Sequence, residues 1–139
     1  MEIKKVTTFK ELDQIVPMMK KLYDSIGSEK YISWSGYLTW IALNFPLKNF
    51  QIWTGWKDDT LIGYIIVQIT QRFFVAECHI VEAYMEGVDE EGTNMVYNKI
   101  VEWAKSKDCH QLTISTKRDK AFAKKYGFES LGTTMAKEI

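Results

Sequence analysis

The sequence predicts an α/β (α+β) domain with a mixed, mostly antiparallel central sheet of six to seven strands flanked by about four helices. Three observations support this fold class. Apolar residues recur at helical steps of three and four over residues 9–26, the pattern changes to strand alternation from Phe50 to about Tyr84, and helix and strand patterns then follow one another. A strand meander followed by helical crossovers is typical of a mixed sheet. With 139 residues, we expect a single domain over 1–139.

The N-terminal third predicts one strand and two helices. Residues 2–7 have the strand pattern, and Thr8 to Glu11 then fit a capping box, in which a hydroxyl and a glutamate satisfy each other's backbone amides. A helix of about five turns follows, stops at Gly27, and contains Pro17, which can kink or split it. Its expected inner face holds Phe9, Leu12, Val16, Met19, Tyr23 and Ile26. A second helix with Tyr37, Trp40, Ile41 and Asn44 on one face ends before Pro46.

The rest of the chain predicts three strands and then alternating helices and strands. A strand over residues 50–56 is followed by a turn at 57–59 and a nearly all-apolar strand at 61–69, which we expect to be covered on both faces. A third strand runs from Phe73 to about Tyr84. The remaining expected elements are a helix at 93–105, a strand at 111–116, a short helix at 119–126 with Gly127 as its left-handed terminal residue, and one or two strands in 128–139.

Composition narrows the partners and the compartment. Eighteen basic and eighteen acidic residues cancel, so nucleic acid is an unlikely partner. No window approaches the roughly 18 apolar residues of a membrane span, and the N-terminus does not resemble a signal peptide. We therefore expect a cytoplasmic protein with no membrane partner and with its two cysteines reduced. The aromatic fraction of 14% makes a homodimer conceivable.

Two features beyond the element order connect the chain to a known family. The segment Phe122-Ala123-Lys124-Lys125-Tyr126-Gly127-Phe128 closes a helix and opens a strand, and Glu77 lies in the strand before a glycine-containing loop. With these two features in this order on the expected helix and strands, the chain resembles the GNAT superfamily of acyl-CoA-dependent N-acyltransferases. The resemblance implies that the fourth and fifth strands splay apart around a pantetheine arm. It also implies that the pyrophosphate binds free backbone amides where the third helix begins.

The resemblance assigns roles to individual residues. Acetyl-CoA is the expected acyl donor, and the acceptor is an unidentified small-molecule or peptide amine. Glu77 is the expected base, acting directly or through water, and Tyr126 is the candidate acid. The expected donor-binding residues are Val81, Gly87, Gly92, Thr93, Thr116 and Lys120, and the expected acceptor-binding residues are Tyr31, Trp34 and His79. Strand alternation puts Glu77, His79 and Val81 on one face and Cys78, Ile80 and Glu82 on the other.

The chain also departs from the family's pattern. The family's loop reads Arg or Gln, two residues, Gly, one residue, Gly or Ala, and neither register of this loop reproduces it, since Glu90 or an inserted residue intervenes between Gly87 and Gly92. The loop is acidic, with Glu86, Asp89, Glu90 and Glu91. Two unit charges ~5 Å apart repel by roughly 3 kcal/mol at an effective dielectric of ~20, less after screening by salt. Acidic residues at a helix start also favour the helix dipole, so ordinary surface residues would look the same.

These departures leave two functional hypotheses. One is a GNAT-like N-acetyltransferase, in which Ala123 occupies the usual tyrosine position and Tyr126, three residues on, either serves as the acid or only packs. The other is a GNAT-fold binding, structural or regulatory module that has lost coenzyme A turnover. A metal site is not expected, because Cys78-His79 and Cys109-His110 would each face opposite sides of a strand and no Cys-x₂-Cys spacing is present.

Overall fold

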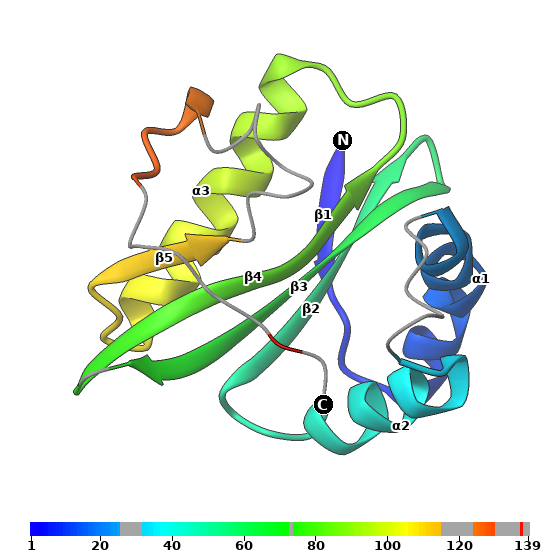
Figure 1. The fold of residues 1–139 in the computed structure, drawn as a ribbon. Coiled ribbons are helices and arrows are strands. Elements are labelled where there is room, and N and C mark those ends of the chain that lie inside the picture. The colour runs from blue at the N-terminus through cyan, green and yellow to red at the C-terminus, as the bar shows by residue number, and fades with distance from the viewer. Residues whose placement is uncertain (26–31, 73, 115–123, 130–136, 138–139) are drawn as a thin grey trace.

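A computed structural model describes residues 1–25, 32–72, 74–114, 124–129 and 137. Its described elements alternate in the expected order of a strand, two helices, a three-strand meander, a helix and a strand (Figure 1). They are β1 (Glu2–Lys5), α1 (Phe9–Ser25), α2 (Trp34–Asn44), β2 (Phe50–Lys57), β3 (Thr60–Arg72), β4 (Val75–Met85), α3 (Glu90–Ser106) and β5 (Gln111–Ile114).

The sheet has the strand order β1-β2-β3-β4-β5, so every strand pairs with its neighbour in the sequence. The first three pairings are antiparallel, and β4 pairs with β5 in parallel. The parallel pair requires a crossover connection, which α3 supplies. The prediction of a mixed, mostly antiparallel sheet is therefore confirmed.

The element counts differ from the prediction. The described residues contain five strands and three helices, against the expected six to seven strands and about four helices. The difference lies at the C-terminus, because the expected helix at 119–126 and the last strands fall mostly on residues outside the described part. Within 124–129, Gly127 has a φ of +74° and its amide donates to the carbonyl of Lys124 at 3.4 Å, which confirms its predicted left-handed conformation.

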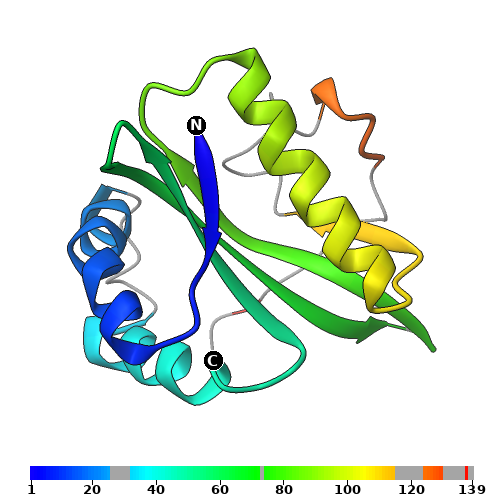
Figure 2. The ribbon, with the colours of Figure 1, turned by 180° about the vertical axis from the view of Figure 1, so that it is seen from behind.

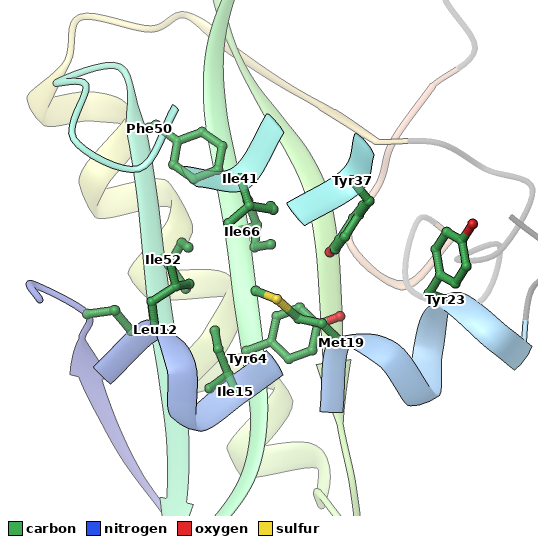
Figure 3. Packing of buried hydrophobic residues seen from close by; sticks show 11 residues of the cluster. Leu12, Ile15, Met19, Tyr23, Tyr37, Ile41, Phe50, Ile52, Tyr64 and Ile66 are labelled. Atoms are coloured by element: carbon green, nitrogen blue, oxygen red, sulfur yellow. The ribbon is translucent and has the colours of Figure 1, made fainter. Parts of the chain in front are cut away.

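The helices cover both faces of the sheet. Figures 1 and 2 show α1 and α2 against one face and α3 against the other. Along β3, Tyr64 and Ile66 join the cluster beneath α1 and α2, whereas Ile65 and Val67 join the cluster beneath α3, and all four are completely buried. Figure 3 shows the first cluster, in which Ile15 and Met19 of α1 meet the strand residues. The prediction that this strand is covered on both faces is confirmed.

The start of α1 follows the predicted capping box. The Glu11 amide donates to Thr8 Oγ1 and the Thr8 amide donates to Glu11 Oε1, both at 3.1 Å. Hydrogen bonds to the Glu11 carboxylate, from Thr7 first and then from Thr8, lower the pKa of this carboxyl. The helix continues past Pro17 without a break. Its inner face differs from the prediction, because Ile15 is buried in place of Val16 while Phe9 is 53% exposed.

Several element boundaries also differ from the prediction. The hairpin of β3 and β4 is longer, since β3 continues to Arg72 and β4 begins at Val75. The third helix begins at Glu90 rather than Thr93, because the Asp89 side chain caps it and adds the acidic loop residues to its first turn. Among the described residues, no helix is long and apolar enough to cross a lipid bilayer.

Candidate functional site

A β-bulge interrupts the pairing of β3 with β4. Ile66 faces Glu82 and the next residue, Val67, faces Ile80, so Val81 is an additional residue in β4. A bulge of this kind breaks the two-residue alternation and re-aims the side chains that follow it. The site described below is built around this irregularity.

The bulge changes the face on which Glu82 lies. Cys78 and Ile80 pack in the cluster beneath α3, as alternation predicts. Val81 packs against the cluster beneath α1 and α2, and Glu82 accepts hydrogen bonds from two tyrosines of that same cluster. The prediction that Glu82 shares a face with Cys78 and Ile80 is therefore wrong, because the extra residue shifts the alternation by one position.

Both carboxylate oxygens of Glu82 have a tyrosine donor. Tyr37 Oη donates to Oε1 at 2.8 Å and Tyr64 Oη donates to Oε2 at 2.5 Å. Burial, followed by the Glu82 charge, raises the pKa of Tyr64, so this hydroxyl stays protonated and serves as a donor. The sequence pattern alone indicates no role for Glu82. One sequence feature could have identified Glu82. Tyr64 lies in a strand expected to be completely buried, and a buried tyrosine needs a hydrogen-bond partner for its hydroxyl.

Among the described residues, β5 pairs with the first half of strand β4. The described pairing joins Glu77–Ile80 to Gln111–Ile114, whereas β4 continues to Met85. Next to the second half of β4 lies a small cavity of about 130 Å³, lined by Ala83, Met85, Val88, Thr93 and Val96. The cavity thus lies between the second half of β4 and the first turns of α3, on the α3 side of the sheet.

The turn before α3 brings together three of the predicted donor-binding residues. Gly87 has a φ of +62°, and Gly92 is buried so closely that an added Cβ would lie 2.7 Å from the Val88 side chain. Thr93 lines the cavity, and its amide and hydroxyl both donate to the carbonyl of Asp89 at 3.0 Å. Asp89 Oδ1 accepts from the Gly92 amide at 2.8 Å, so one amide of the helix start is already bonded to a carboxylate.

Two of the other acidic residues at this turn have cationic neighbours. Glu86 Oε1 accepts from Lys21 Nζ at 2.7 Å and from Tyr84 Oη at 2.6 Å. The hydrogen bond from Lys21, followed by that from Tyr84, lowers the pKa of the Glu86 carboxyl. The same Lys21–Glu86 bond raises the pKa of the Lys21 ammonium. Glu90 lies 3.6 Å from Lys125 Nζ. The negative charge expected to repel a polyanionic donor is therefore partly compensated.

Glu77 and His79 lie in the half of β4 that is paired on both sides. Glu77 is buried, and its Oε2 accepts from Gln111 Nε2 at 2.7 Å. His79 Nδ1 lies 2.8 Å from Thr113 Oγ1, with the donor set by the ring tautomer. Both side chains are thus held against β5, at a distance along β4 from the cavity.

The predicted acceptor-binding residue Trp34 is the first residue of α2. Ser33 caps the helix by accepting from the Gly36 amide at 3.0 Å. The Trp34 ring stacks on Tyr37 with 5.4 Å between centroids and meets Tyr23 at 5.3 Å. Because Tyr37 also bonds Glu82, this aromatic group is connected directly to the carboxylate.

The described turn at 124–126 packs on the outer side of α3. Tyr126 stacks on Tyr97, with ring centroids 4.1 Å apart, and its hydroxyl donates to Asn94 Oδ1 at 2.5 Å. The hydroxyl is therefore held beside the first half of α3. Four residues named in the predictions lie outside the described part of the chain. They are the predicted contacts Tyr31, Thr116 and Lys120, and Ala123, which occupies the family's usual tyrosine position.

The described residues contain no group of three or more His, Cys, Asp or Glu side chains arranged to hold a metal ion. Cys78 and Cys109 are both buried and unbridged. Burial raises the pKa of the Cys78 thiol to about 12 and also raises that of Cys109. The raised pKa values keep both buried thiols mainly protonated at neutral pH, which disfavours a nucleophilic role for them.

Comparison with known proteins gives a structural match without a sequence match. No profile of a known family matches the sequence, and no curated protein matches it. A structure described as a predicted acetyltransferase with acetyl-CoA, from Clostridium acetobutylicum, superposes with a TM-score of 0.81 at 16% identity, covering 99% of this chain and 95% of that one. The aminoglycoside 6'-N-acetyltransferase AAC(6')-Ig from Acinetobacter haemolyticus superposes with a TM-score of 0.73 at 17% identity, covering 100% of this chain and 99% of that one.

The chain has the fold of the GNAT superfamily. The GNAT resemblance in the sequence is therefore confirmed as to fold. A structure from Bacillus halodurans described as a transcriptional regulator also superposes on this chain, with a TM-score of 0.74, 17% identity and 99% of each chain covered. At such identities the GNAT fold alone is shared, and the activity has to be argued from the site.

Proposed function

We propose that this chain is an N-acetyltransferase that transfers an acetyl group from acetyl-CoA to an amine. The observation that carries the proposal is the β4 bulge, which sets a tyrosine-bonded carboxylate, Glu82, beside the point where the described pairing of β4 with β5 ends. The fold supports the donor, because a structural neighbour was solved with acetyl-CoA. It also supports an amine acceptor, because another neighbour is an aminoglycoside N-acetyltransferase.

The residues at the cavity suit an acyl-pantetheine donor in part. Ala83, Met85 and Val96 offer an apolar wall, and Gly87, Gly92 and Thr93 would hold the donor at the amide-rich start of α3. Val81, whose side chain packs toward α1 and α2, stays a predicted donor contact. Asp89 is the exception, because its carboxylate occupies the Gly92 amide and has to release it for a phosphate oxygen to bind there. Thr116 and Lys120 stay predicted donor contacts.

The proposed chemistry needs one carboxylate to accept a proton. The amine nitrogen attacks the thioester carbonyl, a C–N bond forms, the C–S bond breaks, and the thiolate leaves with a proton from water or from Tyr126. We favour Glu82 as the group that accepts the proton of the amine, directly or through water. Glu77, the base predicted from the sequence, is buried and bonded to Gln111 in the fully paired half of β4.

The acceptor is proposed to bind on the α1 and α2 side. Tyr23, Trp34 and Tyr37 form an aromatic group there, and aromatic faces beside a carboxylate favour a cationic amine. The Lys20 ammonium lies 5.4 Å from the centre of the Trp34 ring, a cation–π contact within the chain. Tyr31 and His79 stay predicted acceptor contacts. We place the reaction in the cytoplasm, and a homodimer stays a prediction.

The decisive experiment measures coenzyme A release from acetyl-CoA with a panel of amines, including polyamines and aminoglycosides. Replacing Glu82→Gln should lower kcat by about 10²–10⁴-fold while leaving the acetyl-CoA Kd unchanged, because general base catalysis contributes about that much. The isosteric Glu77→Gln is the matched control on the same strand. If Glu77→Gln abolishes turnover and Glu82→Gln does not, Glu77 is the base. Absence of heat on titration with millimolar acetyl-CoA would end the proposal.

A second candidate is a GNAT-fold binding or regulatory module without coenzyme A turnover. The Asp89 cap on the Gly92 amide favours it, because that carboxylate competes with a phosphate for the same donor. The titration with acetyl-CoA separates the two candidates. Binding without turnover for any amine, unaffected by Glu82→Gln, would favour the module.

A further inference from the structure

A larger cavity lies at the other end of the sheet. It has a volume of about 440 Å³ and opens where β1 ends and β2 begins, between the loop that follows α2 and the C-terminal end of α3. The start of α3 borders the small cavity and its end borders this one. The two cavities share no lining residue, so they are separate places on the molecule. None of the roles discussed above involves the larger cavity.

Three lysines from different parts of the chain line this cavity. They are Lys5 at the end of β1, Lys48 in the loop after α2, and Lys107 just after α3, and all are exposed. Among the described lining residues there is no aspartate or glutamate. Glu11 touches the lining, where its Oε1 accepts from Thr7 and Thr8. Cations converging on a concave surface attract an anion.

The apolar part of the cavity includes aromatic rings and two exposed side chains. Phe9 is 53% exposed and Leu47 is 50% exposed, although both line the cavity. The Phe9 ring meets Phe45 edge to face at 5.1 Å, and Lys107 Nζ lies 5.9 Å from the centre of the Trp103 ring. A volume of 300–1,000 Å³ with apolar and aromatic walls and a few polar groups is typical of a small-molecule site.

We propose that this cavity binds a small organic anion that carries an aromatic ring. The acidic group of the ligand pairs with Lys5, Lys48 and Lys107, and its ring covers the exposed faces of Phe9 and Phe45. This explains why three lysines and the exposed ring of Phe9 line the same cavity. The proposal does not rest on acetyl transfer, because it uses no residue of the β4 site.

The test uses 1-anilinonaphthalene-8-sulfonate as the probe, together with N-phenyl-1-naphthylamine, which keeps the rings and lacks the sulfonate. Binding is followed by probe fluorescence and by energy transfer from tryptophan. We expect one site for the sulfonate, with the neutral probe at least about tenfold weaker. The double variant Lys48→Glu/Lys107→Glu should weaken the sulfonate at least about tenfold. Its matched control, Lys57→Glu/Lys105→Glu, makes the same charge change at exposed lysines outside the cavity.

Three outcomes would overturn the proposal. They are equal affinity for both probes, equal loss of affinity in the control variant, and displacement of the probe by saturating acetyl-CoA, which would place it in the β4 site. If the charge-reversed protein does not fold, the neutral pair Lys48→Gln/Lys107→Gln tests the same prediction. That pair should give a smaller loss, and no loss would contradict the proposal.

Discussion

At the scale of the residue, the four carboxylates around the turn before α3 have different environments. Glu86 is bonded to Lys21 and Tyr84 on the α1 side, and Glu90 lies near Lys125. Asp89 instead points into the helix start and bonds the Gly92 amide, while Glu91 is exposed. Of these groups, Asp89 occupies the amide that a phosphate would use, so its charge should matter most for donor affinity.

We predict that Asp89→Ser tightens acetyl-CoA binding about tenfold at low salt. Serine is also a good helix cap, so the bond to the Gly92 amide can persist while the charge is removed. A tenfold change corresponds to about 1.4 kcal/mol, which is smaller than the repulsion expected between nearby unit charges. Calorimetric titration measures the change, and Glu91→Gln is the control for loss of one exposed charge. Unchanged or weaker binding in Asp89→Ser would contradict the prediction.

At the scale of the element, the β3–β4 hairpin determines where the candidate site lies. The bulge at Val81 reverses the face of Glu82, and the close approach of the two strands at Gly63 fixes the end of β4. A Cβ added at Gly63 would lie 2.1 Å from the carbonyl oxygen of Tyr84 and 2.4 Å from Met85 Sδ. The pairing of these strands therefore depends on a residue without a side chain.

We predict that Gly63→Ala lowers the free energy of unfolding by about 2–4 kcal/mol, because the backbone contact cannot be relieved by a rotamer change. Gly87→Ala is the matched comparison. Its added Cβ would meet nothing within 4 Å, and the cost of about 1–2 kcal/mol comes only from its φ of +62°. Urea unfolding monitored by tryptophan fluorescence measures both. Equal costs would show that the strands can separate at Gly63.

At the scale of the whole molecule, the sheet divides the interior into two cores. Ile15 of α1 belongs to the core shared with α2, and Ile100 of α3 belongs to the core on the opposite face. Both side chains are completely buried. Because β3 contributes alternate residues to both, the described residues of the two cores meet through that sheet.

We predict that Ile15→Val and Ile100→Val each lower the free energy of unfolding by about 0.5–1.5 kcal/mol. The loss of unfolding free energy in the double variant should equal the sum of the two single losses to within about 0.5 kcal/mol, since the two side chains belong to different cores. Urea unfolding of the four proteins gives the coupling energy. A coupling above about 1 kcal/mol would mean that the cores rearrange together.

Much of the fold and part of the site were predictable from local patterns. The Thr8–Glu11 capping box, the doubly buried strand around Tyr64 and Ile65, and Gly127 in the left-handed region each depend on neighbours within a few residues. The element order, together with the Tyr-Gly-Phe segment, was sufficient to indicate the GNAT fold. Such features follow from backbone geometry and hydrophobic periodicity, which a single segment carries by itself.

The amino-acid sequence by itself thus determined the kind and order of the elements and the residues able to carry chemistry. The tertiary structure alone decided which of those residues meet. Glu82 reaches Tyr37 and Tyr64 because of a bulge that depends on the register of β3, and Phe9 is exposed beside three lysines because distant loops converge. The physical reason is that register and loop convergence are set by contacts between segments far apart in the chain, and local patterns do not encode these contacts.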